Sequence, residues 1–328
     1  MSSISRRSFV KFMGSATLAP ALLPSALMAA ESTGSHDTSG AMPLQASAAT
    51  DGYSGYKLIQ VAVDSGVAMV TLNHPPLNLL DEALSDEFDR LTRQLEIDTH
   101  IRVIVLQSAL PKFFIAHSGL HRVAQAPKTV SNTRSFRLTQ LLGERLRNMS
   151  KVVIAKVEGI TRGGGSEIAL AADMCFAAKG KAIFGQPEVG FGLVPGGGST
   201  QRLPRRMGRP RAMEALLGGE DFSAELADHY GYINRALPAA ELGPFVDKLA
   251  RRIATYPSVA IEHIKRAVDM GADAPFSEAL LVEAHESDLC VANDLVQERI
   301  KAAIAAGAET YDVELNLPDL FSKLPPAS

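Results

Sequence analysis

Apolar residues of the chain fall into short runs whose spacing predicts the first structural elements. Two runs, at residues 58–63 and 67–72, are joined by an Asp-Ser-Gly turn, and this pattern predicts a β-hairpin. Residues 81–95 carry Leu and Phe side chains at helical spacing, which predicts an amphipathic helix. The continuous apolar run at 101–106 is typical of a strand that is covered on both faces.

The central stretch of the chain combines a predicted strand, a glycine-rich turn and a helix. A β-branched run at 152–157 predicts the strand, and three glycines at 163–165 precede small residues that predict a helix ending before Asp173. Glycines at a helix start let a ligand approach main-chain N–H groups that have no partner in the helix. These amides and the helix dipole suit a developing negative charge, and Glu167 places a carboxylate one turn further in.

A phosphate-binding loop is the first alternative for this glycine-rich turn. The stretch contains no G-x-x-x-x-G-K-[ST] motif, because Ser166 follows Gly165 directly and no lysine precedes it. It also lacks a G-x-G-x-x-G motif followed by an acidic residue about 20 positions later. A turn that only packs a helix closely on a sheet is the structural alternative, and the glycines alone do not decide between that and an anion site.

A second glycine-rich motif follows the predicted strands at 173–178 and 182–185. It places Glu188 between a proline and a glycine-rich loop that opens a helix at Ser199 or Thr200. Units of two strands and a helix thus recur along residues 58–200, which favours a mixed α/β core over a Rossmann alternation. Further helices are expected at 131–149, 211–217, 224–230, 241–256, 259–270 and 276–306, and residues 311–328 are expected to form an extended tail.

The N-terminus is interpreted as a targeting segment. Arg6 and Arg7 precede a weakly apolar run with two prolines, which resembles a twin-arginine export signal and predicts a signal peptide at 1–30 without a stable membrane span. Residues 31–55 are rich in Ser, Thr, Gly, Ala and Asp and are expected to be a disordered linker. The predicted location is periplasmic or exported, or cytoplasmic if the signal does not function.

Composition excludes several classes of protein. The net charge is −3 and no basic cluster with interleaved aromatic residues occurs, so nucleic acid is not an expected partner. Cys175 and Cys290 lie far apart without metal-ligand spacing, which argues against a disulfide framework. We expect no metal and no redox cofactor.

Residues 154–173 and 184–203 together resemble the enoyl-CoA hydratase/isomerase (crotonase) family. The resemblance covers roughly residues 56–305. It implies an α/β fold with a crotonase-like spiral of ββα repeats at 56–255 and a C-terminal helical trimerisation region at 256–310. The family is often a homotrimer or a dimer of trimers.

The resemblance also implies a site in which two main-chain N–H groups stabilise a thioester enolate. By position, the two donors of this oxyanion hole are Ser118 and Gly164, and the catalytic pair is Glu167 and Glu188. Glu167 is expected to position and activate water, and Glu188 to deliver a proton to Cα. The expected substrate-binding residues are Ala116, His117, Leu120, Gly163, Pro187 and Gly196.

The first oxyanion loop departs from the family pattern. His117 stands where family members usually have glycine, and the acidic residue of the usual motif is missing. The imidazole has two possible roles, as a donor to substrate or as a space-filling group. Basic residues that often meet the CoA phosphates are fewer, with Lys112 and Arg122 as substitutes.

The expected function is hydration of a trans-2-enoyl-CoA or a related enoyl thioester to the 3-hydroxyacyl thioester, with CoA as part of the substrate. Two alternatives keep the same oxyanion hole: an enoyl-CoA isomerase and a CoA-independent hydrolase of a β-dicarbonyl compound. A third, from another class, is an exported protein that binds an acyl ligand without turnover. The predicted export signal motivates the alternatives, because CoA thioesters are cytosolic metabolites.

Overall fold

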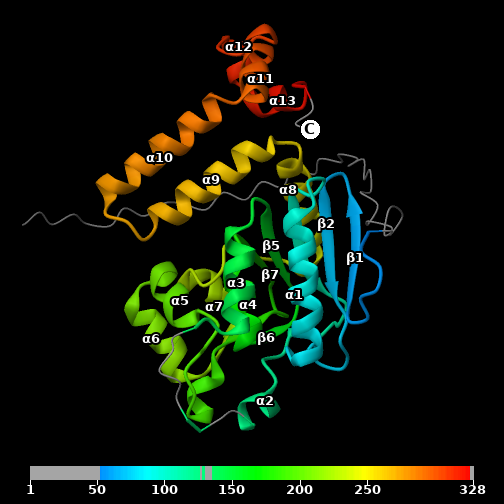
Figure 1. Cartoon of the computed structure of the whole chain (residues 1–328), viewed down its shortest axis with the longest axis vertical. Coiled ribbons are helices and arrows are strands. Elements are labelled where there is room, and N and C mark those ends of the chain that lie inside the picture. The colour runs from blue at the N-terminus through cyan, green and yellow to red at the C-terminus, as the bar shows by residue number, and fades with distance from the viewer. Residues whose placement is uncertain (1–51, 126–127, 130–134, 326–328) are drawn as a thin grey trace, which may run out of the picture. The chain divides into compact units, whose positions relative to one another are not determined.

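The computed structural model describes residues 52–125, 128–129 and 135–325 (Figure 1). The predicted signal peptide at 1–30 and most of the predicted linker lie outside the described residues. The described end of that linker is packed, since Tyr53 is only 8% exposed and its hydroxyl donates to Asp98 Oδ2 at 2.6 Å. The prediction of a disordered linker up to residue 55 is therefore wrong at its end, because an aromatic side chain anchors this part to Asp98.

The larger of two sheets has six strands in the order β1-β2-β3-β5-β7-β10. Strands β1 and β2 form the predicted antiparallel hairpin, and every later neighbour in the sheet is parallel. Parallel neighbours need crossover connections, which the helices supply. The strands are β1 (Ile59–Asp64), β2 (Val67–Leu72), β3 (Val103–Ser108), β5 (Val152–Val157), β7 (Met174–Ala178) and β10 (Arg235–Leu237).

The smaller sheet has four strands in the order β4-β6-β8-β9. Three successive units place their first strand, β3, β5 or β7, in the larger sheet and their second, β4, β6 or β8, in the smaller one. A helix follows each pair, so the expected crotonase-like repeat of two strands and a helix is confirmed. The strands are β4 (Phe113–Ile115), β6 (Ile160–Arg162), β8 (Ile183–Gly185) and β9 (Asp221–Ser223).

Both faces of the larger sheet are buried, as the apolar run at 101–106 predicted. Along β3, Val103 and Val105 point to a cluster that includes Val246 of α8, while Ile104 and Leu106 point to the main core. Helices α1, α3 and α4 supply that main core on the opposite face (Figure 1). The helices up to this point are α1 (Glu82–Ile97), α2 (Leu120–Ala124), α3 (Leu138–Asn148), α4 (Gly164–Ala171), the 3₁₀ helix η1 (Pro187–Phe191), α5 (Ser199–Met207), α6 (Arg209–Gly218), α7 (Ala224–Tyr230) and α8 (Ala239–Ala254).

Helix ends follow side-chain caps. The predicted helix at 81–95 is confirmed as α1, whose N-cap Asp81 accepts a hydrogen bond from Leu84 N at 3.0 Å. The helix predicted at 131–149 begins later, at Leu138. Gln140 Oε1 accepts from Arg137 N at 2.8 Å and caps the helix there.

The C-terminal region is helical, and α9 (Ser258–Gly271) and α10 (Phe276–Val291) lie side by side (Figure 1). The single helix predicted at 276–306 is wrong, because Asn293 caps a new helix, α11 (Asp294–Ala305), by accepting from Leu295 N. The extended tail predicted at 311–328 is also wrong in its described part. It contains α12 (Tyr311–Glu314) and α13 (Leu317–Phe321), and Pro318 lies in the first turn of α13, where proline is tolerated.

None of the described helices is long and apolar enough to cross a bilayer.

Candidate active site

The first predicted oxyanion loop lies between β4 and α2, and main-chain hydrogen bonds hold it. Leu80 N donates to His117 O at 3.0 Å, and Gly119 N donates to Leu80 O at 3.0 Å. These two bonds fix the peptide groups on both sides of Ser118. The position of the Ser118 N–H is therefore set by backbone geometry and not by the side chains of the loop.

Asn78 holds the segment that brackets this loop. Its side chain is fully buried, and its Nδ2 donates to Ser108 Oγ at 2.8 Å and to Phe114 O at 2.9 Å. The residue has a φ of 50°, a left-handed conformation that asparagine tolerates better than most residues. Asn78 thus ties the segment before α1 to the strands β3 and β4, which carry the loop.

Ser118 lies against Gly164, the first residue of α4. A methyl group on Gly164 would overlap Ser118 Oγ, so the two residues are direct neighbours in space. Among the residues that the structure describes, neither Ser118 N nor Gly164 N donates a hydrogen bond. Their role as the two donors of an oxyanion hole stays a prediction.

Glu188 approaches the preceding glycine. Gly163 has a φ of 47°, and a methyl group there would stand 2.5 Å from Glu188 Oε1. Gly163 and Gly164 are consecutive, and consecutive Cα atoms are about 3.8 Å apart, so Glu188 and Ser118 approach neighbouring residues at the start of α4. Only glycine at 163 permits both this backbone conformation and this approach.

The Glu188 carboxyl group is in an environment that disfavours its charge. Burial raises its pKa to about 7, the nearby Glu167 adds to the rise, and a hydrogen bond to its own main chain opposes it. The side chain as a whole is half-buried, but Oε2 is buried and has no hydrogen-bond partner among the described residues. A carboxyl group with this pKa can exchange a proton with a substrate near neutral pH.

Glu167 is held in a different way. It is 3% exposed, and its Oε1 accepts from Gly197 N at 2.7 Å and from Ser199 N at 3.1 Å. Ser199 is the first residue of α5, so the carboxylate also meets the positive end of that helix. This arrangement suits a group that carries a negative charge. The two carboxyl groups of the pair therefore have contrasting environments.

The other residues predicted to bind substrate lie in different surroundings. Ala116 is buried and its carbonyl accepts from Arg162 N, so it shapes the loop. Pro187 begins η1 and sets the direction of Glu188, whereas Leu120 is 40% exposed and Gly196 faces Arg137. Gly196 shares the peptide group whose N–H, that of Gly197, binds Glu167 Oε1, so it borders that carboxyl group.

His117 uses one ring nitrogen within the loop. Its Nδ1 lies 2.8 Å from Ser118 O, and since a carbonyl only accepts, Nδ1 carries the proton. Nδ1 therefore has a partner within the loop. This favours a structural role for that side of the ring over donation to substrate.

Several residues of the site were not predicted. Gly197 and Ser199 bind Glu167, and Ser166 and Gln186 share the Tyr232 hydroxyl in a buried network. Ser166 lies in the first glycine-rich motif, and Gln186, Gly197 and Ser199 lie in the second. Nothing in the sequence connects Tyr232 to these motifs, because it lies 46 residues beyond Gln186.

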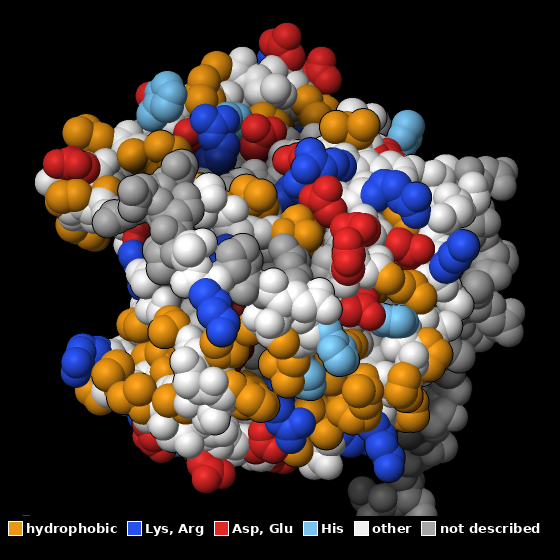
Figure 2. All heavy atoms as spheres, turned by 60° about the horizontal axis from the view of Figure 1, so that its bottom comes forward, with side chains coloured by type: hydrophobic (Ala, Val, Ile, Leu, Met, Phe, Trp, Pro, Cys, Tyr) orange, Lys and Arg blue, Asp and Glu red, His pale blue; other side chains and the backbone are white. Residues whose placement is uncertain are grey.

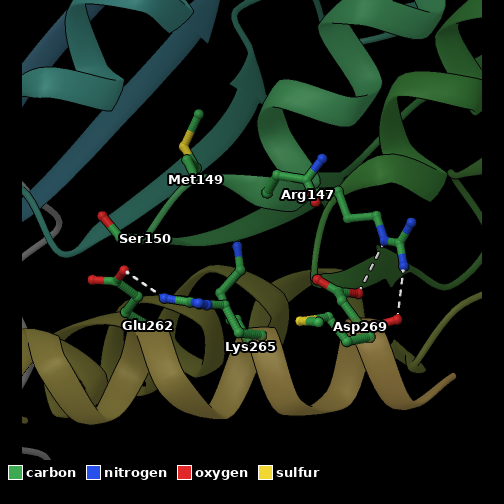
Figure 3. Close-up of a pocket in the computed structure, with 9 residues that line it drawn as sticks. Arg147, Met149, Ser150, Glu262, Lys265 and Asp269 are labelled. Atoms are coloured by element: carbon green, nitrogen blue, oxygen red, sulfur yellow. Dashed lines mark hydrogen bonds and ion pairs between the residues drawn. The ribbon is translucent and has the colours of Figure 1, made fainter. Parts of the chain in front are cut away.

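A cavity of about 270 Å³ lies elsewhere, between the end of α3 and α9 (Figure 3). Its charged groups are already paired. Arg147 binds Asp269, and Arg266 lies 3.6 Å from Glu262 (Figure 3). Lys265 binds Asp173. None of the residues that line it belongs to the predicted site, so the cavity carries no argument for the chemistry.

Hydrophobic side chains gather on the face that Figure 2 turns forward, which includes the end of the molecule with α2 and α6. Helix α6 packs against η1, the helix that carries Glu188. Solvent-exposed apolar residues of α2, the η1 region and α6 are Leu120, Val123, Val189, Phe191, Val194, Met213 and Leu217. An apolar surface of this kind beside the carboxyl groups suits an acyl chain more than a charged ligand.

The described residues contain no group of three or more His, Cys, Asp or Glu side chains that could hold a metal ion. What the site offers chemically is an acid that titrates near neutral pH and a second carboxylate within electrostatic range of the first, beside the residues predicted to supply two N–H donors.

Repeated units of two strands and a helix, with the two strands divided between two sheets, define the structural class of this protein. Residues 62–311 match the Enoyl-CoA hydratase/isomerase family, and the chain belongs to it.

Two curated relatives and a solved structure agree with this family. The short-chain-enoyl-CoA hydratase of Clostridium acetobutylicum is 31% identical over 239 residues, which cover 73% of this chain and 91% of that protein. The crotonyl-CoA hydratase of Syntrophomonas wolfei is 30% identical over 249 residues, with coverages of 75% and 95%. The crystal structure of an enoyl-CoA hydratase from Bacillus anthracis matches with a TM-score of 0.69 at 28% identity, over 75% of this chain and 95% of that one.

Proposed function

We propose that this protein is a hydro-lyase that adds water to a trans-2-enoyl-CoA and forms the 3-hydroxyacyl-CoA. The observation that carries this function is the meeting of Ser118, Gly164 and Glu188 around two consecutive glycines. The names of the relatives support the same reaction, since both curated relatives are enoyl-CoA or crotonyl-CoA hydratases.

The oxyanion hole acts on the thioester carbonyl. The N–H groups of Ser118 and Gly164 donate to its oxygen and stabilise the enolate that forms when water adds at Cβ. A single donor of this kind is typically worth about 3–4 kcal/mol of barrier. Both donors belong to the main chain, so they are in place before the substrate binds.

The two carboxyl groups divide the proton transfers between them. Glu167, as a carboxylate, accepts a proton from the attacking water, whose oxygen bonds to Cβ. Glu188, with its raised pKa, is protonated at or below neutral pH and gives its proton to Cα of the enolate. One water and one double bond are consumed, and proton exchange restores both carboxyl groups for the next cycle.

The test is hydration of crotonyl-CoA by the purified protein, followed as the loss of the conjugated thioester absorbance. Glu167→Gln and Glu188→Gln should each lower kcat by about 10²–10⁴-fold, the usual value of a general acid or base. Glu158→Gln is the matched control. The Glu158 carboxylate pairs with Lys156 at 3.3 Å and is not one of the predicted site residues, so this substitution should leave kcat unchanged.

Unchanged turnover in both Glu variants would refute the assigned roles. A product that is isomerised but not hydrated would favour the isomerase instead. Hydrolysis of a CoA-free β-dicarbonyl compound would favour the hydrolase. Binding of acyl-CoA in a thermal shift assay without any turnover would favour the acyl-ligand binder.

The proposed reaction uses CoA only as part of the substrate and needs no metal or redox cofactor. Activity should therefore survive dialysis against a chelator. Lys112 is exposed before the oxyanion loop and is a proposed contact for the CoA phosphates. Lys112→Ala should then raise KM for crotonyl-CoA without changing kcat.

A homotrimer, alone or as a dimer of trimers, is the proposed assembly. The C-terminal helices support it, because α9 and α10 expose large apolar side chains that water would otherwise cover, among them Val268, Phe276 and Leu281 at 65%, 80% and 72%. Light scattering should give a mass of three or six chains. Leu281→Glu should lower that mass, and a monomeric wild-type protein would contradict the assembly.

Export by the twin-arginine signal is the proposed route of this protein to the periplasm. The N-terminal residues support it only through their sequence. A fusion of residues 1–30 to a reporter that needs export while folded should reach the periplasm, and replacement of Arg6 and Arg7 by Lys should keep it in the cytoplasm.

A further inference from the structure

Tyr232 is a buried hydroxyl that the reaction above does not use. The residue follows α7 and is completely buried, and its ring packs against Phe184 at 5.5 Å and Phe222 at 6.2 Å between centroids. Burial raises the pKa of this phenol to about 12, so the hydroxyl is neutral throughout the working pH range. It therefore acts through hydrogen bonds and not through charge.

Both hydrogen bonds of this hydroxyl lead toward the carboxyl pair. Its oxygen lies 2.6 Å from Ser166 Oγ, and it accepts from Gln186 Nε2 at 3.1 Å. Both partner side chains are also fully buried. The bonds span 66 and 46 residues of sequence, so they join parts of the chain that have no local connection.

The two hydrogen-bond partners of the Tyr232 hydroxyl lie close in sequence to the two glutamates. Ser166 immediately precedes Glu167 on α4, and successive helical side chains point about 100° apart. Ser166 therefore faces Tyr232 while Glu167 faces the loop at Gly197. On the other side, Gln186 stands two residues before Glu188, and Pro187 between them has a fixed φ.

We infer that Tyr232 is a positioning residue that sets the separation of the Glu167 and Glu188 carboxyl groups by bonding the residues beside both. The inference rests on the proposed hydration, in which one water must lie between the two groups. Without the hydroxyl, no hydrogen bond through Tyr232 joins the first turn of α4 to the junction of β8 and η1. A misplacement of about 1 Å in a reacting group can cost about a hundredfold in rate.

Tyr232→Phe is the test, because it removes the hydroxyl and keeps the ring contacts. It should lower kcat for crotonyl-CoA by about 10–100-fold and leave KM within about twofold, since the oxyanion donors and the acyl surface are untouched. Tyr230→Phe is the matched control. The Tyr230 hydroxyl binds the exposed Glu214 at 3.1 Å, and its loss should leave kcat unchanged.

The pH profile of kcat separates positioning from a general loss of folded protein. Glu188 must be protonated to act, so activity falls as pH rises through its pKa. A looser pair lets water in and weakens the repulsion from Glu167, so the alkaline limb of Tyr232→Phe should move to lower pH. A merely structural defect would lower the profile without moving that limb.

Ser166→Ala is the second variant and removes one arm of the network at a helical position that favours alanine. It should lower kcat less than Tyr232→Phe, with the same direction of shift. Wild-type kcat in both variants, beside a large loss in Glu188→Gln, would overturn the positioning role alone. Wild-type kcat in Glu188→Gln would overturn the proposed function itself.

Discussion

Replacement of Glu188 by glutamine should stabilise the protein at alkaline pH while it removes activity. In the folded protein the carboxyl group has a pKa of about 7, against an ordinary 4.5 when the chain is unfolded. Below pH 4.5 the group is protonated in both states and costs nothing. As pH rises from 4.5 to 7, the unfolded chain releases its proton first, so the free energy of unfolding falls.

The size of this effect follows from the two pKa values. At about 1.4 kcal/mol per pH unit they correspond to about 3 kcal/mol above pH 7, and access of water to the half-buried side chain lowers this to about 2 kcal/mol. Glutamine resembles the protonated acid and avoids the cost. For a chain of this size, about 2 kcal/mol corresponds to a rise of about 4–8 °C in Tm.

The assay is thermal unfolding of wild type and Glu188→Gln at pH 5 and pH 8, at equal protein concentration. The difference in Tm should be small at pH 5, where about a quarter of the effect is present, and clearly larger at pH 8. Glu167→Gln is the contrast, because its carboxylate accepts two main-chain hydrogen bonds, and its loss should lower Tm at both pH values. A Glu188→Gln protein that is less stable than wild type at pH 8 would refute the assignment of a buried, disfavoured charge.

Three further substitutions test the backbone around the site. Gly163→Ala should lower kcat at least tenfold, because its methyl group would stand 2.5 Å from Glu188 Oε1, and a crystal structure with an unmoved carboxyl group would contradict this reason. Asn78→Ala should lower the free energy of unfolding by about 2–4 kcal/mol in urea titrations, since it removes the amide that donates to Phe114 O and Ser108 Oγ and accepts from His74 N, and a loss below about 1 kcal/mol would show that water replaces the amide. His117→Ala should lower kcat less than tenfold, because main-chain bonds still hold the loop; a larger loss would give the imidazole a direct part in the reaction.

The sequence was sufficient for the fold and for the residues that carry strong local patterns. The continuous apolar run at 101–106 and the helical spacing at 81–95 are local signals, and both appear in the structure as expected. The two glycine-rich motifs placed Glu167 and Glu188 because their spacing is fixed along the chain. Their catalytic roles remain predictions for the kinetic assays.

Other features depend on contacts that no local pattern contains. The break at Asn293 was missed because the apolar spacing continues past it, and a single cap decides where the helix ends. The bond from Gly197 N to Glu167 was not predicted, because adjacent glycines are equivalent in sequence and only the folded loop shows which N–H reaches the carboxylate. Tyr232 was missed because its partners are 46 and 66 residues away.

The bracket that Leu80 forms around Ser118 has a consequence for how this protein can change. The two hydrogen bonds join peptide groups of two chain segments, and every amino acid except proline supplies such groups equally. Position 117 can therefore exchange its side chain while the donor keeps its place, whereas the side chain at 118 must also fit against Gly164. New acyl or carrier preferences can arise there by single substitutions, with the machinery for the oxyanion left intact.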